Sequence, residues 1–228
     1  MGFNLLDIEC EDKSLVELAF THPSYTKEKE LSYTQSYERL EFLGDAVLKL
    51  CISDLLYKKY PDYEEGELSK IRSILVSDAT LAKIAKSIGI DKNLILGTGE
   101  ENTGGRTRES NIACAMEAVL GAYYLNGKIT FVEKFLEENL LPIANDIDEH
   151  FEKYNAKAVL QEYTQGQNGI LPDYKVINTK GPAHKPIFEV EVSYMGEVLA
   201  VGSGHSKKEA QQDAAYQACL KLNIISNG

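Results

Sequence analysis

The hydrophobic period of this 228-residue chain changes once, near residue 172, and that change limits the folds open to it. Before this point, apolar residues recur at helical spacing, and Pro61, Gly89, Gly127 and the Gly97–Gly105 stretch separate the segments. No alternating strand pattern precedes residue 172. The pattern therefore predicts a helical first domain, with helices at Leu15–Thr21, Tyr37–Tyr60, Glu67–Val76, Ala79–Ile88, Asn111–Leu125 and Thr130–Ile147.

The remainder of the chain predicts a small mixed domain. A helical segment at Ala158–Gln165 precedes an extended segment, Tyr174–Thr179, and residues 188–194 then alternate apolar and polar side chains. A third strand, Val198–Val201, leads to a helix with an alanine-rich stripe, for which Ser206 is the expected N-cap and Glu209 its capping-box partner. We expect an all-α domain at 1–150, a linker at 151–156, and an α+β domain of order α-β-β-β-α at 157–226.

Charge is unevenly divided along the chain. The net charge is −11, from 24 basic and 35 acidic residues, which on its own argues against a nucleic-acid binder. Residues 155–228 hold seven residues of each sign, which leaves 17 basic and 28 acidic residues in 1–154. The C-terminal domain is therefore neutral overall, and the excess acid belongs to the helical domain.

Three carboxylates share one face of the helix predicted at 37–60. At about 100° per residue, Glu38, Glu41 and Asp45 lie within an arc of about 60° on a helix that is apolar most of the way round. Such carboxylates repel one another, and partly buried acids need a counter-charge. Solvent could screen these charges, or Arg39 could neutralise them. A divalent cation that prefers hard oxygen ligands, such as Mg²⁺, Mn²⁺ or Ca²⁺, could also neutralise them.

Two further acids are candidates for the same site. Glu117 is the one acid in the small, apolar segment 110–125, where it either meets the first cluster across a helix–helix contact or reaches solvent. Glu65 lies in an acidic run with Glu64 and Glu67, and a helix N-terminus favours acids for dipole reasons. An active-site role and a helix-starting role both remain open for Glu65.

Several motifs together resemble one family. THPSY, ERLEFLGDAVL, EGELSKIRSILV and SNIACAMEAVLGAYYL, in this order, resemble bacterial ribonuclease III, whose signature corresponds to Glu38–Ala46. The C-terminal part, with LQE, GPAHKP and SKKEAQQDAA, resembles the double-stranded-RNA-binding domain of that family. The resemblance covers nearly the whole chain.

The resemblance implies a homodimeric, cytoplasmic endonuclease that cuts double-stranded RNA with Mg²⁺, or with Mn²⁺ in its place, and uses no nucleotide cofactor. It implies products with 5′-phosphate and 3′-hydroxyl ends and short 3′ overhangs, and substrates among ribosomal RNA precursors and other structured transcripts. By motif position, the metal ligands are Glu41, Asp45 and Glu117, and the catalytic residues are Asp45, Glu117, Glu38 and Glu65. Phe42 is expected to insert into the partner subunit, and the alternative for Phe42 is a place in the core of its own subunit.

One position departs from the family pattern. Cys114 stands where the family usually has an Asp metal ligand, and a thiol is a soft ligand that matches Mg²⁺ poorly. Two hypotheses follow. Either the enzyme keeps its activity because Glu41, Asp45 and Glu117 are intact, or the chain is a catalytically weakened double-stranded-RNA-binding protein. Tyr37, where the family often has Asn, is a milder departure.

Double-stranded RNA is recognised through its phosphates and 2′-hydroxyls across about 16 base pairs. Lysines at the start of the last helix are expected to hold phosphates, and the other interface residues to enter two minor grooves. The interface residues are Gln161, Glu162, His184, Lys185, Lys207 and Lys208. Gln211 stands where many such domains have a third basic residue. In the helical domain, Arg106 and Arg108 either contact RNA or belong to a solvated loop.

Other classes of protein are less compatible with the sequence. A helical hydrolase of small phosphate compounds joined to an RNA-binding module is a third hypothesis, which the signature disfavours. No apolar run approaches the roughly 20 residues of a membrane span, and the first residues do not resemble a secretion signal, so we expect no membrane association. Four scattered cysteines without a CxxC pair predict neither a zinc site nor a disulfide framework.

Overall fold

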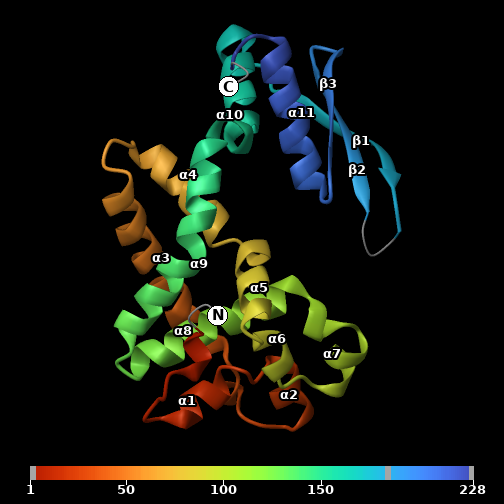
Figure 1. Cartoon of the computed structure of the whole chain (residues 1–228). Helices are drawn as coiled ribbons and strands as arrows, with labels where there is room; N and C mark the ends of the chain where they lie inside the picture. Colours follow the sequence, from red (N-terminus) through yellow and green to blue (C-terminus); the bar gives the residue numbers. More distant parts are fainter. Residues whose placement is uncertain (1–3, 183–185, 226–228) are drawn as a thin grey trace. The chain divides into compact units, whose positions relative to one another are not determined.

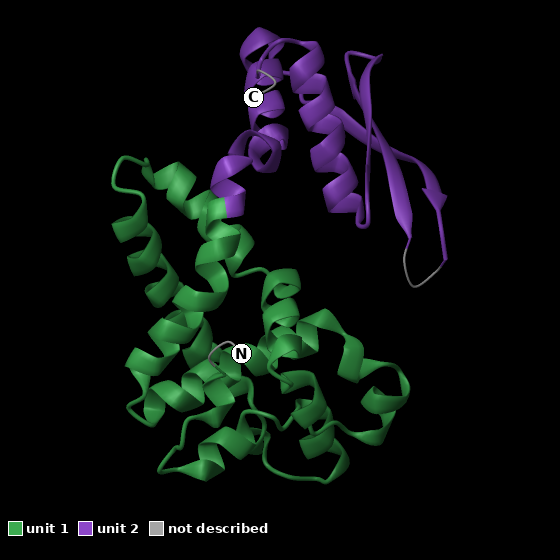
Figure 2. Cartoon of the chain, in the orientation of Figure 1, with its two compact units in different colours: residues 1–145 green, residues 146–228 purple. Residues whose placement is uncertain are grey.

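The computed structural model describes residues 4–182 and 186–225 and is shown in Figure 1. The chain divides into two compact units, residues 1–145 and 146–228 (Figure 2). The first unit is helical and the second combines helices with one sheet, so the predicted fold class is confirmed. Among the described helices, none is long and apolar enough to cross a membrane.

The six helices predicted before residue 149 are confirmed, and the described residues add three short α-helices and three 3-10 helices. His22 and Pro23 start one of these additions, because the His22 Nδ1 atom accepts a hydrogen bond from Ser24 N at 3.0 Å and Pro23 takes the first helical position. The elements are η1 (Leu5–Asp7), α1 (Lys13–Leu18), α2 (Pro23–Glu28), η2 (Tyr33–Gln35), α3 (Glu38–Lys59), α4 (Glu65–Leu75), α5 (Asp78–Ser87), α6 (Ile90–Asn93), α7 (Thr98–Asn102), η3 (Gly105–Thr107), α8 (Glu109–Leu125) and α9 (Ile129–Glu149). The Gly97–Gly105 stretch, predicted only as an interruption, thus contains α7.

The backbones of α3 and α8 touch at two glycines. A Cβ atom at Gly44 of α3 would overlap the carbonyl oxygen of Glu117, and a Cβ atom at Gly121 of α8 would overlap the carbonyl oxygen of Leu40. Any larger residue would push the helices apart. Helix α8 is buried on nearly every side, so this contact lies in the core of the first unit.

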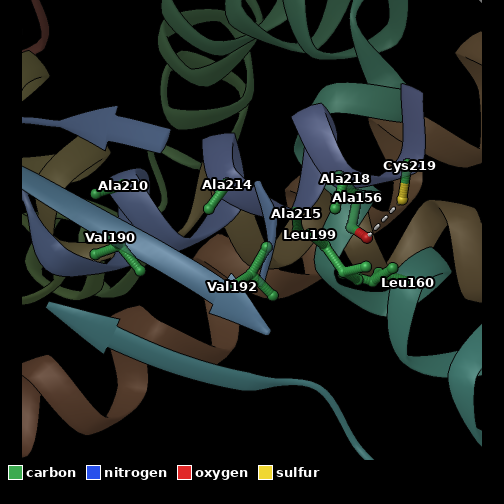
Figure 3. Packing of buried hydrophobic residues seen from close by; sticks show 10 residues of the cluster. All are labelled: Ala156, Leu160, Val190, Val192, Leu199, Ala210, Ala214, Ala215, Ala218 and Cys219. Atoms are coloured by element: carbon green, nitrogen blue, oxygen red, sulfur yellow. Dashed lines mark hydrogen bonds between the residues drawn. The ribbon is translucent and has the colours of Figure 1, made fainter. Parts of the chain in front are cut away.

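The second unit packs two helices on one face of a three-stranded antiparallel sheet of order β1-β2-β3. Its elements are α10 (Phe151–Asn168), β1 (Asp173–Lys180), β2 (Ile187–Tyr194), β3 (Glu197–Gly204) and α11 (Lys207–Lys221). Residues 151–156, expected as a linker, lie in α10. The alanine stripe of α11 is buried against Val190, Val192 and Leu199 (Figure 3).

The start of α11 differs slightly from the predicted capping box. The Ser206 side chain accepts a hydrogen bond from Glu209 N at 3.1 Å, which confirms it as the N-cap. The Glu209 carboxylate, however, accepts from His205 N at 2.7 Å, one residue earlier than a capping box requires. Both contacts fix the entry of the chain into α11.

We expect Gly44→Ala to lower the free energy of unfolding by about 3 kcal/mol, because the new methyl group overlaps the α8 backbone. Urea denaturation measures the change. Gly66→Ala on α4 is the matched control, since a Cβ atom there meets nothing within 4 Å. Equal stability of the two variants would show that the helices can separate without cost.

Candidate functional site

The contact between α3 and α8 brings three of the predicted acids together. Gly44 lies between Glu41 and Asp45 in sequence, and its missing Cβ points at the backbone of Glu117. The negative charges of Asp45 and Glu41 both act on Glu117. These three acids, which we call the acid cluster, therefore meet where the two helices cross.

Burial and mutual repulsion raise the pKa values of two acids of the acid cluster, Glu117 and Glu41. Burial raises the pKa of Glu117 to about 7, and the charges of Asp45 and Glu41 add to the effect. Burial also raises the pKa of Glu41. A cluster with these properties gains from a cation, because positive charge reverses the repulsion that raises both pKa values.

Cys114 takes part in the acid cluster as a neutral thiol. Burial raises its pKa to about 12, and the charge of Glu41 contributes. Its S–H group donates a hydrogen bond to the Glu41 carboxylate, which lowers the pKa of Glu41 and partly offsets the effect of burial. An ionised Asp at this position would repel Glu41 instead.

Asp45 and Glu38, both on α3, have partners close in sequence. Lys49 Nζ lies 2.7 Å from Asp45 Oδ2, one helical turn further on, and Ser36 Oγ donates to Glu38 Oε2 at 3.2 Å. Arg39, considered as the counter-charge, is exposed, and no ion pair of it occurs among the described residues. An exposed pair such as Asp45–Lys49 contributes at most about 1 kcal/mol to stability. A divalent cation could therefore displace Lys49 from the Asp45 carboxylate.

Glu65 and Asp78 differ in their relation to the acid cluster. Glu65 is exposed in the first turn of α4, where Ser69 Oγ donates to it at 2.6 Å, and no described interaction links it to the acid cluster. Asp78, in the first turn of α5, adds to the raised pKa values of Glu41, Cys114 and Glu117. The sequence did not single out Asp78, because an acid after Ser77 is usual at a helix start.

The acid cluster has the chemistry of a hard-cation site but not the geometry of a formed one. Within residues 4–182 and 186–225, no group of three or more His, Cys, Asp or Glu side chains is arranged to hold a metal ion. The donors of the acid cluster are carboxylate oxygens, which suit Mg²⁺ and Mn²⁺. The carboxylates of the acid cluster are therefore of the right chemical type for such a cation. Their side chains must move closer together to bind it.

Arg106 and Arg108 are engaged within the chain. Arg106 Nη2 lies 2.6 Å from Glu101 Oε2, and Arg108 pairs with Glu100. Glu100 also accepts a hydrogen bond from Asn111 Nδ2 at 2.8 Å, near the start of α8. Together these pairs hold the segment that leads into α8, and contact of either arginine with RNA stays a prediction.

Helix α3 exposes large apolar side chains on one face. Phe42 is 82% exposed, which excludes a place in the core of its own chain. Leu50 is 69% exposed and Tyr57 is 74% exposed. At spacings of eight and seven residues these three side chains share one face of α3, and an exposed patch of this kind marks an interaction surface.

The second unit presents the polar residues expected to contact RNA. Lys207 and Lys208 are exposed in the first turn of α11, and Gln161 and Glu162 are exposed on α10. His184 and Lys185 lie outside the described residues. Four of the six predicted interface residues are thus on the surface of two packed helices.

Comparison with known proteins divides the chain in the same way. A family model described as "Ribonuclease-III-like" matches residues 12–144, and one described as "Double-stranded RNA binding motif" matches residues 156–222. The chain is 44% identical over 220 residues to Ribonuclease 3 of Streptococcus pyogenes serotype M2 (strain MGAS10270), which covers 96% of this chain and 95% of the relative. Ribonuclease 3 of the serotype M5 strain Manfredo is similar to the same extent.

Solved structures of a relative resemble the first unit. The nuclease domain of ribonuclease III from Campylobacter jejuni is 39% identical with a TM-score of 0.54, and the match covers 59% of this chain and 92% of that one. That structure is described as showing flexibility in a region involved in dimer formation. A second structure of the same domain matches with a TM-score of 0.53 at the same identity, covering 59% of this chain and 90% of that one.

The raised pKa of Glu117 predicts a pH dependence of stability in metal-free protein. A carboxyl with a pKa near 7 when folded and 4.5 when unfolded binds its proton more tightly in the folded chain. The free energy of unfolding therefore falls as the pH rises from about 4.5 to about 7 and stays low above that. Glu117→Gln removes the charge, so it should raise the melting temperature at pH 8 and change it little at pH 5.

Thermal unfolding with a chelator present measures this effect, and about 2–4 °C is expected for each kcal/mol gained. Glu109→Gln is the control on the same helix, because Glu109 is exposed in the first turn of α8. Loss of its charge should lower the melting temperature slightly at both pH values. A Glu117→Gln melting curve identical to wild type at pH 8 would contradict the repulsion described here.

Proposed function

The chain belongs to the ribonuclease III family, and we propose that it hydrolyses double-stranded RNA with Mg²⁺ bound by Glu41, Asp45 and Glu117. It is an endoribonuclease with a double-stranded-RNA-binding unit. The observation that carries the metal assignment is the meeting of these three carboxylates at the α3–α8 crossing. The negative charges of Asp45 and Glu41 raise the pKa of Glu117 there, and a bound cation would offset this repulsion.

The residues of the acid cluster have separate tasks in this proposal. Mg²⁺, or Mn²⁺ in its place, supplies positive charge to the phosphoryl oxygens and lowers the pKa of water. Glu41 and Glu117 hold the cation from two helices, and Asp45 orients it after leaving Lys49. Glu38 and Glu65 are further proposed catalytic residues, and Glu65 has no described interaction with the acid cluster before RNA binds. The products are duplex ends with 5′-phosphate and 3′-hydroxyl groups and short 3′ overhangs.

Cys114 is compatible with activity in this proposal. Its thiol orients Glu41 by hydrogen bonding, and Asp78 adds a nearby negative charge that the family pattern at position 114 would otherwise supply. We do not assign Cys114 as a metal ligand, because its thiol is a soft ligand that matches Mg²⁺ poorly. We therefore favour an active enzyme over a chain that only binds RNA, with ribosomal RNA precursors and other structured transcripts as cytoplasmic substrates.

A second copy of the chain is the proposed partner of α3. Phe42 projects from the helix that carries the acid cluster, so a dimer formed through it would place two sites in fixed relation to each other. A similar domain from Campylobacter jejuni is described in terms of dimer formation. Two sites held in one dimer can each cut one strand of a duplex.

The second unit holds the substrate in this proposal. Lys207 and Lys208 bind phosphates, aided by the positive end of the α11 dipole, and Gln161 and Glu162 reach 2′-hydroxyls. His184 enters the second minor groove, with Lys185 nearby. Because lysine–phosphate contacts release counterions from the RNA, binding should weaken with added salt.

Incubation with a long RNA duplex tests the proposed reaction. We expect short duplex products with Mg²⁺ and none with a chelator, and Glu117→Gln should bind duplex without cutting it. Binding without products under all metal conditions would establish the alternative, a catalytically weakened RNA-binding protein. Absence of both binding and cleavage would refute both.

Replacement of Cys114 in the same assay separates an active enzyme from a weakened one. Cys114→Asp should change the cleavage rate by less than about tenfold, equivalent to about 1.4 kcal/mol in the barrier. Cys114→Ser, which keeps a hydrogen-bond donor to Glu41, is the matched control and should retain activity. A large gain for Cys114→Asp from a near-zero wild-type rate would overturn our preference.

Phe42→Ala should weaken self-association at least about thirtyfold, as expected for a central aromatic residue of an interface. Sedimentation across a range of protein concentrations measures the dissociation constant. Tyr33→Ala is the control, because Tyr33 is 74% exposed on η2 of the same unit and lies outside α3. Unchanged association of Phe42→Ala would rule out α3 as the interface.

A further inference from the structure

Lys157 on α10 occupies an unusual position for a lysine. Its Nζ atom donates a hydrogen bond to Gln211 Oε1 at 2.8 Å and lies 4.6 Å from the centre of the Tyr174 ring. Its side chain is half-buried, whereas lysine head groups are usually free in solvent. Two contacts thus hold one ammonium group in place before any ligand arrives, which reduces the entropy lost on binding.

The location of Lys157 connects the two helices expected to contact RNA. Lys157 and Gln161 are four residues apart and share one face of α10. Gln211 is three residues after Lys208 and four after Lys207, so it shares their face of α11. The hydrogen bond to Gln211 therefore places the Lys157 ammonium group between the two sets of residues.

The surroundings of Lys157 are positive rather than negative. Burial lowers its pKa, and the charge of Lys208 lowers it further, so the two ammonium groups repel each other. Among the described residues, Lys157 forms no ion pair with a carboxylate. Its partner Gln211 is a neutral acceptor, which holds the ammonium group without cancelling its charge, as Glu would. An anion near both lysines would relieve the repulsion.

We propose that Lys157 is a third phosphate-contacting cation of the RNA-binding surface, held by Gln211 between Gln161 and Lys208. This inference rests on the proposed binding of double-stranded RNA by the second unit. It assigns to α10 a charge that the α11 sequence lacks at position 211. The competing interpretation is that Lys157 only connects α10 to α11, in which case its loss changes stability and not RNA affinity.

Salt-dependent binding of duplex RNA to the intact chain distinguishes the two interpretations. Affinity is measured by fluorescence anisotropy over a series of KCl concentrations, with a chelator present to prevent cleavage. Lys157→Met keeps the apolar stem over Tyr174 and removes the charge. We expect about fivefold weaker binding near 0.15 M KCl and a slope of log K against log salt reduced by about 0.9.

The control is Lys175→Met on β1, which removes the same charge from the opposite face of the sheet to Tyr174 and should leave the slope unchanged. Lys157→Gln is a second neutral variant for the case that Lys157→Met does not fold, as judged by thermal unfolding, and should show the same reduced slope. Lys157→Arg should keep the wild-type slope.

Three results would overturn the inference. A neutral variant at 157 with wild-type affinity and slope would leave Lys157 a purely structural connection, whatever its stability. An equal loss of RNA affinity and slope in Lys175→Met would show that the effect comes from the overall charge of the chain and not from the position of Lys157. Failure of the wild-type chain to bind duplex RNA would refute the proposed function itself, and this inference with it.

Discussion

The close approach of α3 and α8 is the contact on which the acid cluster depends. Gly44 and Gly121 allow each helix to touch a backbone carbonyl of the other, and Glu117 itself supplies one of these carbonyls. The same residue therefore forms the helix contact with its main chain and the acid cluster with its side chain. Movement of α8 away from α3 would also carry Glu117 away from Glu41 and Asp45, so packing and chemistry are linked here.

Periodicity predicted the fold well, because the long helices and the second unit bury regular apolar stripes. Periodicity did not predict the short helices α2 and α7, since they depend on contacts such as the His22 cap rather than on a periodic face. The acid cluster was predictable from Glu38–Asp45 spacing and from the isolation of Glu117. Asp78 was not, because only the packing of α5 on α8 brings it near. The ion pairs of Arg106 and Arg108 lie within one irregular segment that has no periodic signal, and the exposure of Phe42 depends on tertiary neighbours.

The two units handle charge in opposite ways. In the first, like charges gather in a partly buried position and shift toward protonation, as Glu117 does. In the second, lysines gather where α10 and α11 meet, and Gln211 and Tyr174 hold one of them without neutralising it. The acidic arrangement favours a cation and the basic one an anion. A net charge of −11 conceals both, since it averages over two local fields of opposite sign.

The protonated thiol of Cys114 has a consequence for chemical durability. Thiolates, not thiols, react with peroxides, disulfides and alkylating agents. Burial raises the pKa of Cys114 to about 12 and the pKa values of Cys51 and Cys219 to about 11, and it raises that of Cys10 as well. At neutral pH the sulfurs of Cys114, Cys51 and Cys219 are therefore almost entirely unreactive thiols. Having sulfur rather than oxygen at position 114 does not make the acid cluster a target for oxidants.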